Sequence, residues 1–147
     1  MGITLNHFSS LTKSYITGLQ GDELDNKSVA SMVKHFPGSG PLDGGKDSHF
    51  PPGIQSYRGD NFDYHIKPFE EAIKSGVSSI MPYYSLPIGI TKEEVAAGYN
   101  SELLLDLLRN KYSFDGIICT DWAIISDISM PDGELVKPAS SYGVENL

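Results

Sequence analysis

The sequence predicts an α/β fold built from parallel βα units, and three observations support this class. Strand-like apolar runs alternate with helix-like segments, which is the pattern of parallel sheets with helical crossovers. Residues 117–120 form an unbroken run that suits a strand buried on both faces. Three predicted strands end in polar or aromatic side chains, where such sheets and barrels place their sites. We therefore expect part of a (β/α)8 barrel.

The first half of the chain is expected to contain a short helix, a strand and a long loop. Residues 11–19 suit a helix that Gly18 or Gly21 would close, because glycine is favoured just after a helix. Residues 29–36 become apolar and predict a strand, which a run of proline and glycine stops. Residues 37–61 then show little periodicity and abundant Gly, Pro, Asp and His. A loop this long in a compact domain is usually functional or disordered.

A helix and a second strand are predicted next. Asp63 can cap a helix that ends before Gly76, since glycine adopts the left-handed conformation that closes many helices. Residues 77–81 follow as a strand. The apolar face of the helix, at helical spacing, consists of Ile66, Phe69, Ala72 and Ile73.

Two further helices are predicted before the strand at residues 117–120. Thr91 and Glu94 have the spacing of a capping box, which predicts that a helix begins at Thr91. Residues 101–111 predict another helix, and residues 130–141 are loop-like. The expected buried stripe of the 101–111 helix consists of Leu103, Leu104, Leu107 and Leu108.

Composition and charge exclude several classes of partner. The formal net charge of −8, with Lys and Arg scattered along the chain, argues against nucleic acid and against an anionic membrane as partners.

The sequence shows no signal peptide and no membrane span. The N-terminus has neither a basic start nor a long apolar core, and no run approaches transmembrane length. Cys119 is the only cysteine, so no internal disulfide can form and the compartment stays undecided.

Candidate site residues follow the three predicted strands, at positions 34–35, 83–84 and 121–122. Asp121 at a strand end could attack a carbon electrophile, bind a metal or hold a sugar hydroxyl, but it could equally cap a helix. Lys34 and His35 could instead be a surface cation and a buried histidine. Together the three pairs place a cation, an imidazole, phenols, a carboxylate and an indole at the carboxyl ends of the predicted strands. This set of side chains suits sugar binding. The four histidines show no spacing typical of metal ligands, so we expect neither a metal nor a cofactor.

Three segments in this order resemble glycoside hydrolase family 3. They are Lys34-His35-Phe36-Pro37-Gly38, Ser79-Ile80-Met81-Pro82-Tyr83-Tyr84, and Phe114-Asp115-Gly116-Ile117-Ile118-Cys119-Thr120-Asp121-Trp122. The resemblance is strongest over residues 15–127. It implies that residues 1–147 form a partial N-terminal domain of that family, roughly the C-terminal half of its (β/α)8 barrel.

The resemblance also implies roles for individual residues. Asp121 matches the nucleophile of a retaining mechanism, and Lys34 with His35 matches the pair that binds hydroxyls of the sugar at the cleavage site. Tyr84 would lie beside the nucleophile, and Trp122 would form part of the sugar-binding wall. The implied activity is hydrolysis of terminal non-reducing β-D-glucosyl or related residues, and the implied partner is a β-glucoside or oligosaccharide. Lys34 nearby would help keep Asp121 ionised.

The origin of the general acid/base stays open at this point. In β-glucosidases of this family it is a Glu from a second domain, which this chain does not contain. The N-acetylglucosaminidase branch instead uses an Asp-Ser-His loop, which Asp47 and His49 would match as an acid/base dyad. Ser39 stands where that branch usually has His, and the loop is longer, so the β-glucosidase branch is favoured. A further alternative is a non-catalytic remnant that binds sugar weakly.

Half a barrel would leave parallel strands with unpaired edges and one apolar face uncovered. We therefore expect this chain to be a segment of a larger enzyme. Its exposed edges would be covered by the remainder of that enzyme or by self-association.

Overall fold

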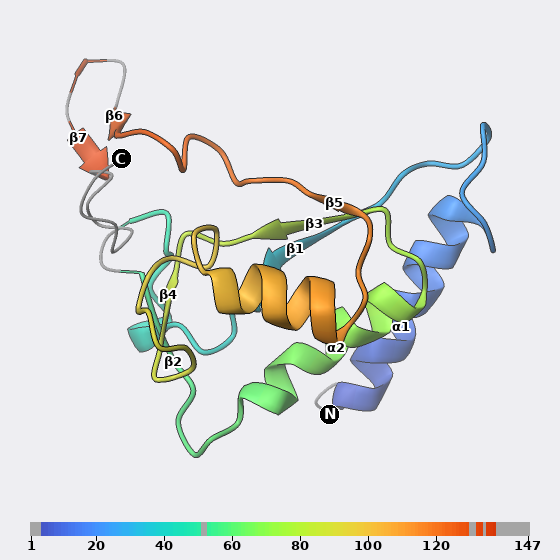
Figure 1. Cartoon of the computed structure of the whole chain (residues 1–147), viewed down its shortest axis with the longest axis horizontal. Helices are drawn as coiled ribbons and strands as arrows, with labels where there is room; N and C mark the ends of the chain where they lie inside the picture. The colour runs from blue at the N-terminus through green and yellow to red at the C-terminus, as the bar shows by residue number, and fades with distance from the viewer. Residues whose placement is uncertain (1–3, 51–52, 130–131, 134, 138–147) are drawn as a thin grey trace.

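The computed structural model describes residues 4–50, 53–129, 132–133 and 135–137. Its centre is a three-stranded parallel sheet in the order β1–β3–β5, made of β1 (Met32–Phe36), β3 (Ser79–Pro82) and β5 (Ile117–Ile118). Helices alternate with these strands along the chain (Figure 1). The predicted α/β class with parallel strands is confirmed.

The main hydrophobic core lies between this sheet and the helices. Val33, Ile80 and Ile118 occupy one register row and pack into that core. The neighbouring row holds Met32, Ser79 and Ile117, of which the two outer residues are exposed and the central Ser79 is buried. In Figure 1 the helices lie below the three strands, on the core side.

Helix α1 (Leu5–Gln20) is longer than the predicted helix at residues 11–19. It begins earlier because the Thr4 hydroxyl accepts a hydrogen bond from the His7 amide and so caps the helix. Of the two predicted closing glycines, Gly21 ends the helix, with a φ of 79° that favours glycine.

Gln20, the last residue of α1, ties the helix to the starts of two strands. Its side-chain oxygen accepts hydrogen bonds of 3.0 Å from the amides of Ser31 and Ser78, and its amide nitrogen donates to the Gly76 carbonyl at 2.7 Å. The side chain is buried. One buried amide group therefore satisfies backbone groups at the amino ends of β1 and β3.

Helix α2 (Phe62–Lys74) confirms the predicted apolar face, with Ile66, Phe69 and Ala72 buried. The expectation that Asp63 caps it is wrong, because Asn61 occupies the cap position and Asp63 lies within the first turn. A carboxylate there still complements the positive end of the helix dipole. Gly76 follows the helix with a φ of 72°, as expected for a closing glycine.

The helix predicted over residues 101–111 is present as η2 (Glu102–Lys111), but it is wider than an α-helix. Hydrogen bonds such as Tyr112 amide to Leu107 carbonyl, 3.0 Å, join residues five apart. Leu103 and Leu108, five apart, are therefore the fully buried residues of the stripe, while Leu104 and Leu107 are partly buried.

The helix predicted to begin at Thr91 is absent, and residues 91–99 form bends and turns. The Thr91 hydroxyl donates to the Glu93 carbonyl and accepts from the Asn100 amide, so it caps no helix. Ala97 donates its backbone N–H to the Ser85 carbonyl at 3.0 Å. In a helix starting at Thr91 this N–H would instead bind a carbonyl within the helix. Tertiary packing of this segment overrides its local capping signal.

The long loop predicted over residues 37–61 contains regular structure. A short helix η1 (Asp43–Gly45) is followed by β2 (Ile54–Ser56), which pairs in parallel with β4 (Leu86–Ile88). Three-residue strands are too short to show the alternation by which strands are recognised. The pairing of β2 with β4 anchors the C-terminal part of this segment.

The strand at residues 117–120 is shorter and more exposed than predicted. The prediction that it is buried on both faces is wrong. β5 covers Ile117–Ile118 alone, with Ile117 67% exposed, and Cys119 and Thr120 are not buried. The reason is its edge position, since β5 pairs only with β3 in the described part of the chain.

The end of the described chain forms a small antiparallel hairpin of β6 (Ile128–Ser129) and β7 (Leu135–Lys137). The loop predicted over residues 130–141 is therefore wrong at β7, and residues 130–131, 134 and 138–141 lie outside the described residues. None of the helices that the structure describes combines the length and apolar character needed to cross a membrane.

Candidate active site

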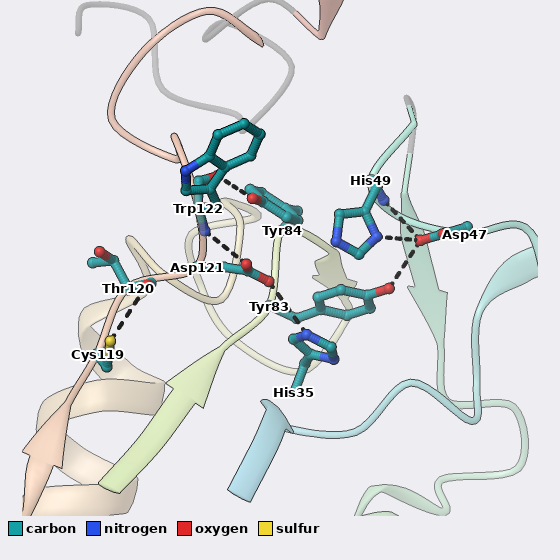
Figure 2. Close-up of polar contacts among 9 residues, drawn as sticks. All are labelled: His35, Asp47, His49, Tyr83, Tyr84, Cys119, Thr120, Asp121 and Trp122. Carbon is teal, nitrogen blue, oxygen red and sulfur yellow. Dashed lines mark hydrogen bonds and ion pairs between the residues drawn. The ribbon is translucent and has the colours of Figure 1, made fainter. Parts of the chain in front are cut away.

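The carboxyl ends of β1, β3 and β5 meet at one edge of the central sheet, as the sequence predicts. His35, the Tyr83–Tyr84 pair and Asp121 come together there, and a loop brings in Asp47 and His49 (Figure 2). The parallel register produces this meeting, because it aligns the strand ends on the same side.

Asp121 is nearly buried, with 8% of its surface exposed. Its Oδ1 atom accepts a 2.6 Å hydrogen bond from the backbone amide of Trp122. Its Oδ2 atom is buried and accepts no hydrogen bond from the described residues. Residues 122–125 form turns, so Asp121 caps no helix, and its Oδ2 atom is not used by the backbone of the described residues.

His35 is the nearest ionisable neighbour of that oxygen, with 3.4 Å between its Nε2 atom and Asp121 Oδ2. Burial lowers the pKa of His35 below its ordinary value, although the Asp121 carboxylate acts in the opposite direction. The neutral imidazole form of His35 is therefore favoured beside the Asp121 side chain.

A second pair lies in the loop, where the Nδ1 atom of His49 is 2.7 Å from Asp47 Oδ1. The same oxygen accepts the His49 backbone amide and the Tyr83 hydroxyl, each at 3.0 Å. These bonds, with the His49 amide first, lower the pKa of Asp47 to about 2. An ionised Asp47 favours a proton on His49 Nδ1, which leaves Nε2 free to accept or deliver a proton.

The two imidazole pairs belong to one cluster. The rings of His35 and His49 have centroids 6.1 Å apart, and the His49 ring lies 5.1 Å from that of Tyr84. Tyr84 is fully buried and donates its hydroxyl to the Trp122 carbonyl, so it holds the chain segment that follows Asp121. The sequence-predicted residues His35, Tyr84, Asp121, Asp47 and His49 are therefore brought together.

Lys34 and Trp122 are placed differently. Trp122 is 81% exposed, and its backbone forms hydrogen bonds with Tyr84 and Asp121. Lys34 is exposed and forms no ion pair with Asp121 among the described residues. It lines a cavity of about 440 Å³ between α1, β1 and α2. The expected support of the Asp121 charge by Lys34 stays a prediction.

Tyr83 is the residue of the cluster to which the sequence assigned no role. Its ring stacks on His35, with centroids 4.3 Å apart, while its hydroxyl binds Asp47. The available signal was its position at a strand end next to Tyr84. Nothing in the sequence indicates which of two adjacent tyrosines faces which partner.

The geometry permits a defined chemistry. A buried carboxylate with one unpartnered oxygen can act as a nucleophile, and an Asp-supported imidazole can move a proton. No group of three or more His, Cys, Asp or Glu side chains suited to a metal ion occurs in the part of the chain that the structure describes.

Comparison with known proteins identifies a family match over most of the chain. Residues 4–141 match the model described as glycosyl hydrolase family 3 N terminal domain. Over 140 residues the chain is 49% identical to the probable beta-glucosidase C of Aspergillus oryzae, a match that covers 95% of this chain and 22% of the relative. It is 38% identical over 152 residues to the periplasmic beta-glucosidase/beta-xylosidase of Dickeya chrysanthemi, covering 93% of this chain and 23% of the relative.

A solved structure shows the same arrangement of elements. A glycoside hydrolase family 3 beta-N-acetylglucosaminidase from Paenibacillus sp. str. FPU-7 is similar with a TM-score of 0.66 and 32% identity. The match covers 77% of this chain and 20% of that one. The chain thus spans about a fifth of the length of these similar proteins.

Proposed function

Because this chain belongs to glycosyl hydrolase family 3, we propose that it carries the nucleophile of a retaining β-glycosidase, namely Asp121. The observation that carries the proposal is the buried Oδ2 atom of Asp121, which accepts no hydrogen bond from the described residues while Oδ1 is held by the Trp122 amide. A fixed carboxylate with one free oxygen is what attack on an anomeric carbon requires.

The reaction proceeds in two displacements. Asp121 Oδ2 forms an ester bond with the anomeric carbon while the bond to the leaving oxygen breaks and that oxygen takes a proton from an acid. Water then attacks the same carbon, gives up a proton to a base, and releases the carboxylate. The hydrogen bond from the Trp122 amide to Oδ1 orients the Asp121 side chain for this attack.

The substrate group in this proposal is a terminal β-D-glucosyl unit or a related β-glycosyl unit. Two relatives at 49% and 38% identity bear the names beta-glucosidase C and beta-glucosidase/beta-xylosidase, which supports this choice. His35 and Lys34 would bind sugar hydroxyls, Tyr84 would support the nucleophile segment, and the exposed indole of Trp122 would face the sugar.

A second candidate concerns the acid/base, for which the 2.7 Å contact between His49 and Asp47 is the specific observation. In this version the Asp47–His49 dyad protonates the leaving oxygen and later deprotonates water, so that both partners of the mechanism lie in this chain. The similar structure named a beta-N-acetylglucosaminidase supports the alternative in which the sugar carries an N-acetyl group.

Covalent trapping tests the nucleophile. A 2-deoxy-2-fluoro glucoside with a good leaving group needs little protonation, so it should label Asp121 even if the acid/base lies elsewhere. Mass spectrometry of the digested chain should place the adduct on Asp121 and find none in Asp121→Asn. Asp115→Asn is the matched control, because Asp115 is exposed on the approach to β5 and should leave labelling unchanged.

Two results would overturn the assignment. Label on Asp47 or Asp115 with Asp121 unmodified would show that another carboxylate attacks. Complete absence of both labelling and aryl β-glucoside turnover in the folded chain would favour the non-catalytic remnant.

A further inference from the structure

Tyr83 stands between the two halves of the proposed site, and no role has been assigned to it. It directly follows β3, is 5% exposed, and its backbone amide donates to the Phe36 carbonyl at 2.9 Å. Its backbone is therefore fixed to β1 as well as to β3. A side chain on such an anchored segment can hold others in place.

The phenol contacts one side of the site. The Tyr83 hydroxyl donates to Asp47 Oδ1 at 3.0 Å, the same oxygen that accepts His49 Nδ1 at 2.7 Å. Asp47 and His49 are both more than a third exposed, so their loop alone constrains them weakly. Tyr83 is the buried member of this trio.

The aromatic ring contacts the other side. It lies nearly parallel to the His35 imidazole, with an interplanar angle of 23° and centroids 4.3 Å apart. His35 in turn places Nε2 at 3.4 Å from Asp121 Oδ2 (Figure 2). One side chain thus contacts both the Asp47 carboxylate and the histidine beside the Asp121 carboxylate.

We infer that Tyr83 is a positioning residue that sets the Asp47–His49 pair and the His35–Asp121 pair relative to each other. Its hydroxyl fixes Asp47, which keeps the proton of neutral His49 on Nδ1 and presents Nε2 to the site. Its ring fixes the plane of His35 beside the carboxylate. The positioning itself stands on these contacts, whereas its effect on turnover rests on the proposed function.

The decisive variant is Tyr83→Phe, which keeps the stacked ring and removes the hydroxyl. Tyr112→Phe is the matched control, because the Tyr112 hydroxyl makes a similar 2.8 Å bond to the Glu70 carboxylate away from the site. Imidazole ¹⁵N spectra of the chain should show His49 protonated on Nδ1 in the wild type and in Tyr112→Phe. In Tyr83→Phe the two neutral tautomers of His49 should be mixed.

Turnover provides an independent measurement. If His49 is the acid/base, Tyr83→Phe should slow hydrolysis of a β-glucoside with a poor leaving group by roughly tenfold or more, and affect a good leaving group much less. Tyr83→Leu also removes the stacked ring, so it should in addition slow labelling of Asp121 by the fluoro glucoside.

The outcomes distinguish the positioning role of Tyr83 from the proposal that the Asp47–His49 dyad is the acid/base. An unchanged His49 tautomer in folded Tyr83→Phe would overturn the inference. A shifted tautomer with equal effects on both leaving groups would support the positioning role of Tyr83 and count against the dyad as the acid/base. A shifted tautomer in Tyr112→Phe as well would show a general loosening of the fold and would also overturn the inference.

Discussion

At the scale of single residues, the site is defined by which polar atoms are satisfied. Asp121 Oδ1 is held by a backbone amide, whereas the buried Oδ2 atom accepts no hydrogen bond within the part of the chain that the structure describes. Asp47 is the opposite case, because three donors converge on one of its oxygens. The two carboxylates therefore differ in kind, one kept available and the other kept ionised.

Acid titration should reveal the lowered pKa of Asp47 as a pH-dependent contribution to stability. The pKa of Asp47 is lowered from 3.8 to about 2 in the folded chain, so its contribution to stability is complete above 3.8 and is lost as the pH falls towards about 2. We expect urea unfolding midpoints of the wild type and Asp47→Asn to differ above that window and to converge within it. Because Asp47 is more than half exposed, the difference should be small. A difference that stays constant down to the lowest pH at which the chain folds would contradict this expectation.

At the scale of elements, the sequence predicted the alternation of strands and helices because burial patterns of single elements are local. The apolar face of α2 and the glycine that closes α1 were both readable. The absence of a helix at Thr91 depends instead on contacts between segments, such as the hydrogen bond from the Ala97 amide to the Ser85 carbonyl. The short β2–β4 pair also escaped prediction, because three residues carry too little pattern.

The candidate site likewise has a part that the sequence predicted and a part that it did not. The positions of His35, Tyr84 and Asp121 at strand ends predicted that they would meet, since parallel strands align their carboxyl ends. The exposed position of Lys34 was one of two alternatives that the sequence left open. The bridging position of Tyr83 could not be predicted, because it depends on how loops and side chains pack.

Two glycines give a matched test of the β3–β5 pairing. A Cβ atom at Gly116 would lie 2.6 Å from the Ser78 carbonyl oxygen, which accepts the Ile117 amide that joins β5 to β3. Gly116→Ala should therefore lower the free energy of unfolding by about 1–3 kcal/mol. Gly18, within α1, has no atom within 4 Å of the added carbon. Gly18→Ala should raise the free energy of unfolding by about 0.5–1 kcal/mol.

Urea denaturation of the two variants and the wild type measures both effects. Equal effects of the two substitutions would show that the close approach at Gly116 does not constrain β5. Reduced labelling of Asp121 in Gly116→Ala would further connect the pairing to the site.

At the scale of the whole molecule, the sheet has one covered face and one exposed face. The helices cover the face of Val33, Ile80 and Ile118, while Met32 and Ile117 project from the other. Both outer strands pair on one side only within the described residues. Exposed apolar residues on the two unpaired outer strands form a surface that other strands can cover, as in the closed barrel of this family.

This surface predicts that the 147-residue chain self-associates in solution. Ile117→Lys places a charge on the exposed face and should shift the chain towards monomer in sedimentation velocity at high concentration. The melting temperature at low concentration should change little, because Ile117 is already 67% exposed. Leu105→Lys is the control, since Leu105 is 56% exposed on η2, away from the sheet face, and should leave association unchanged. Equal association of the wild type and Ile117→Lys would place the self-association surface elsewhere, and a monomeric wild type at high concentration would contradict the prediction.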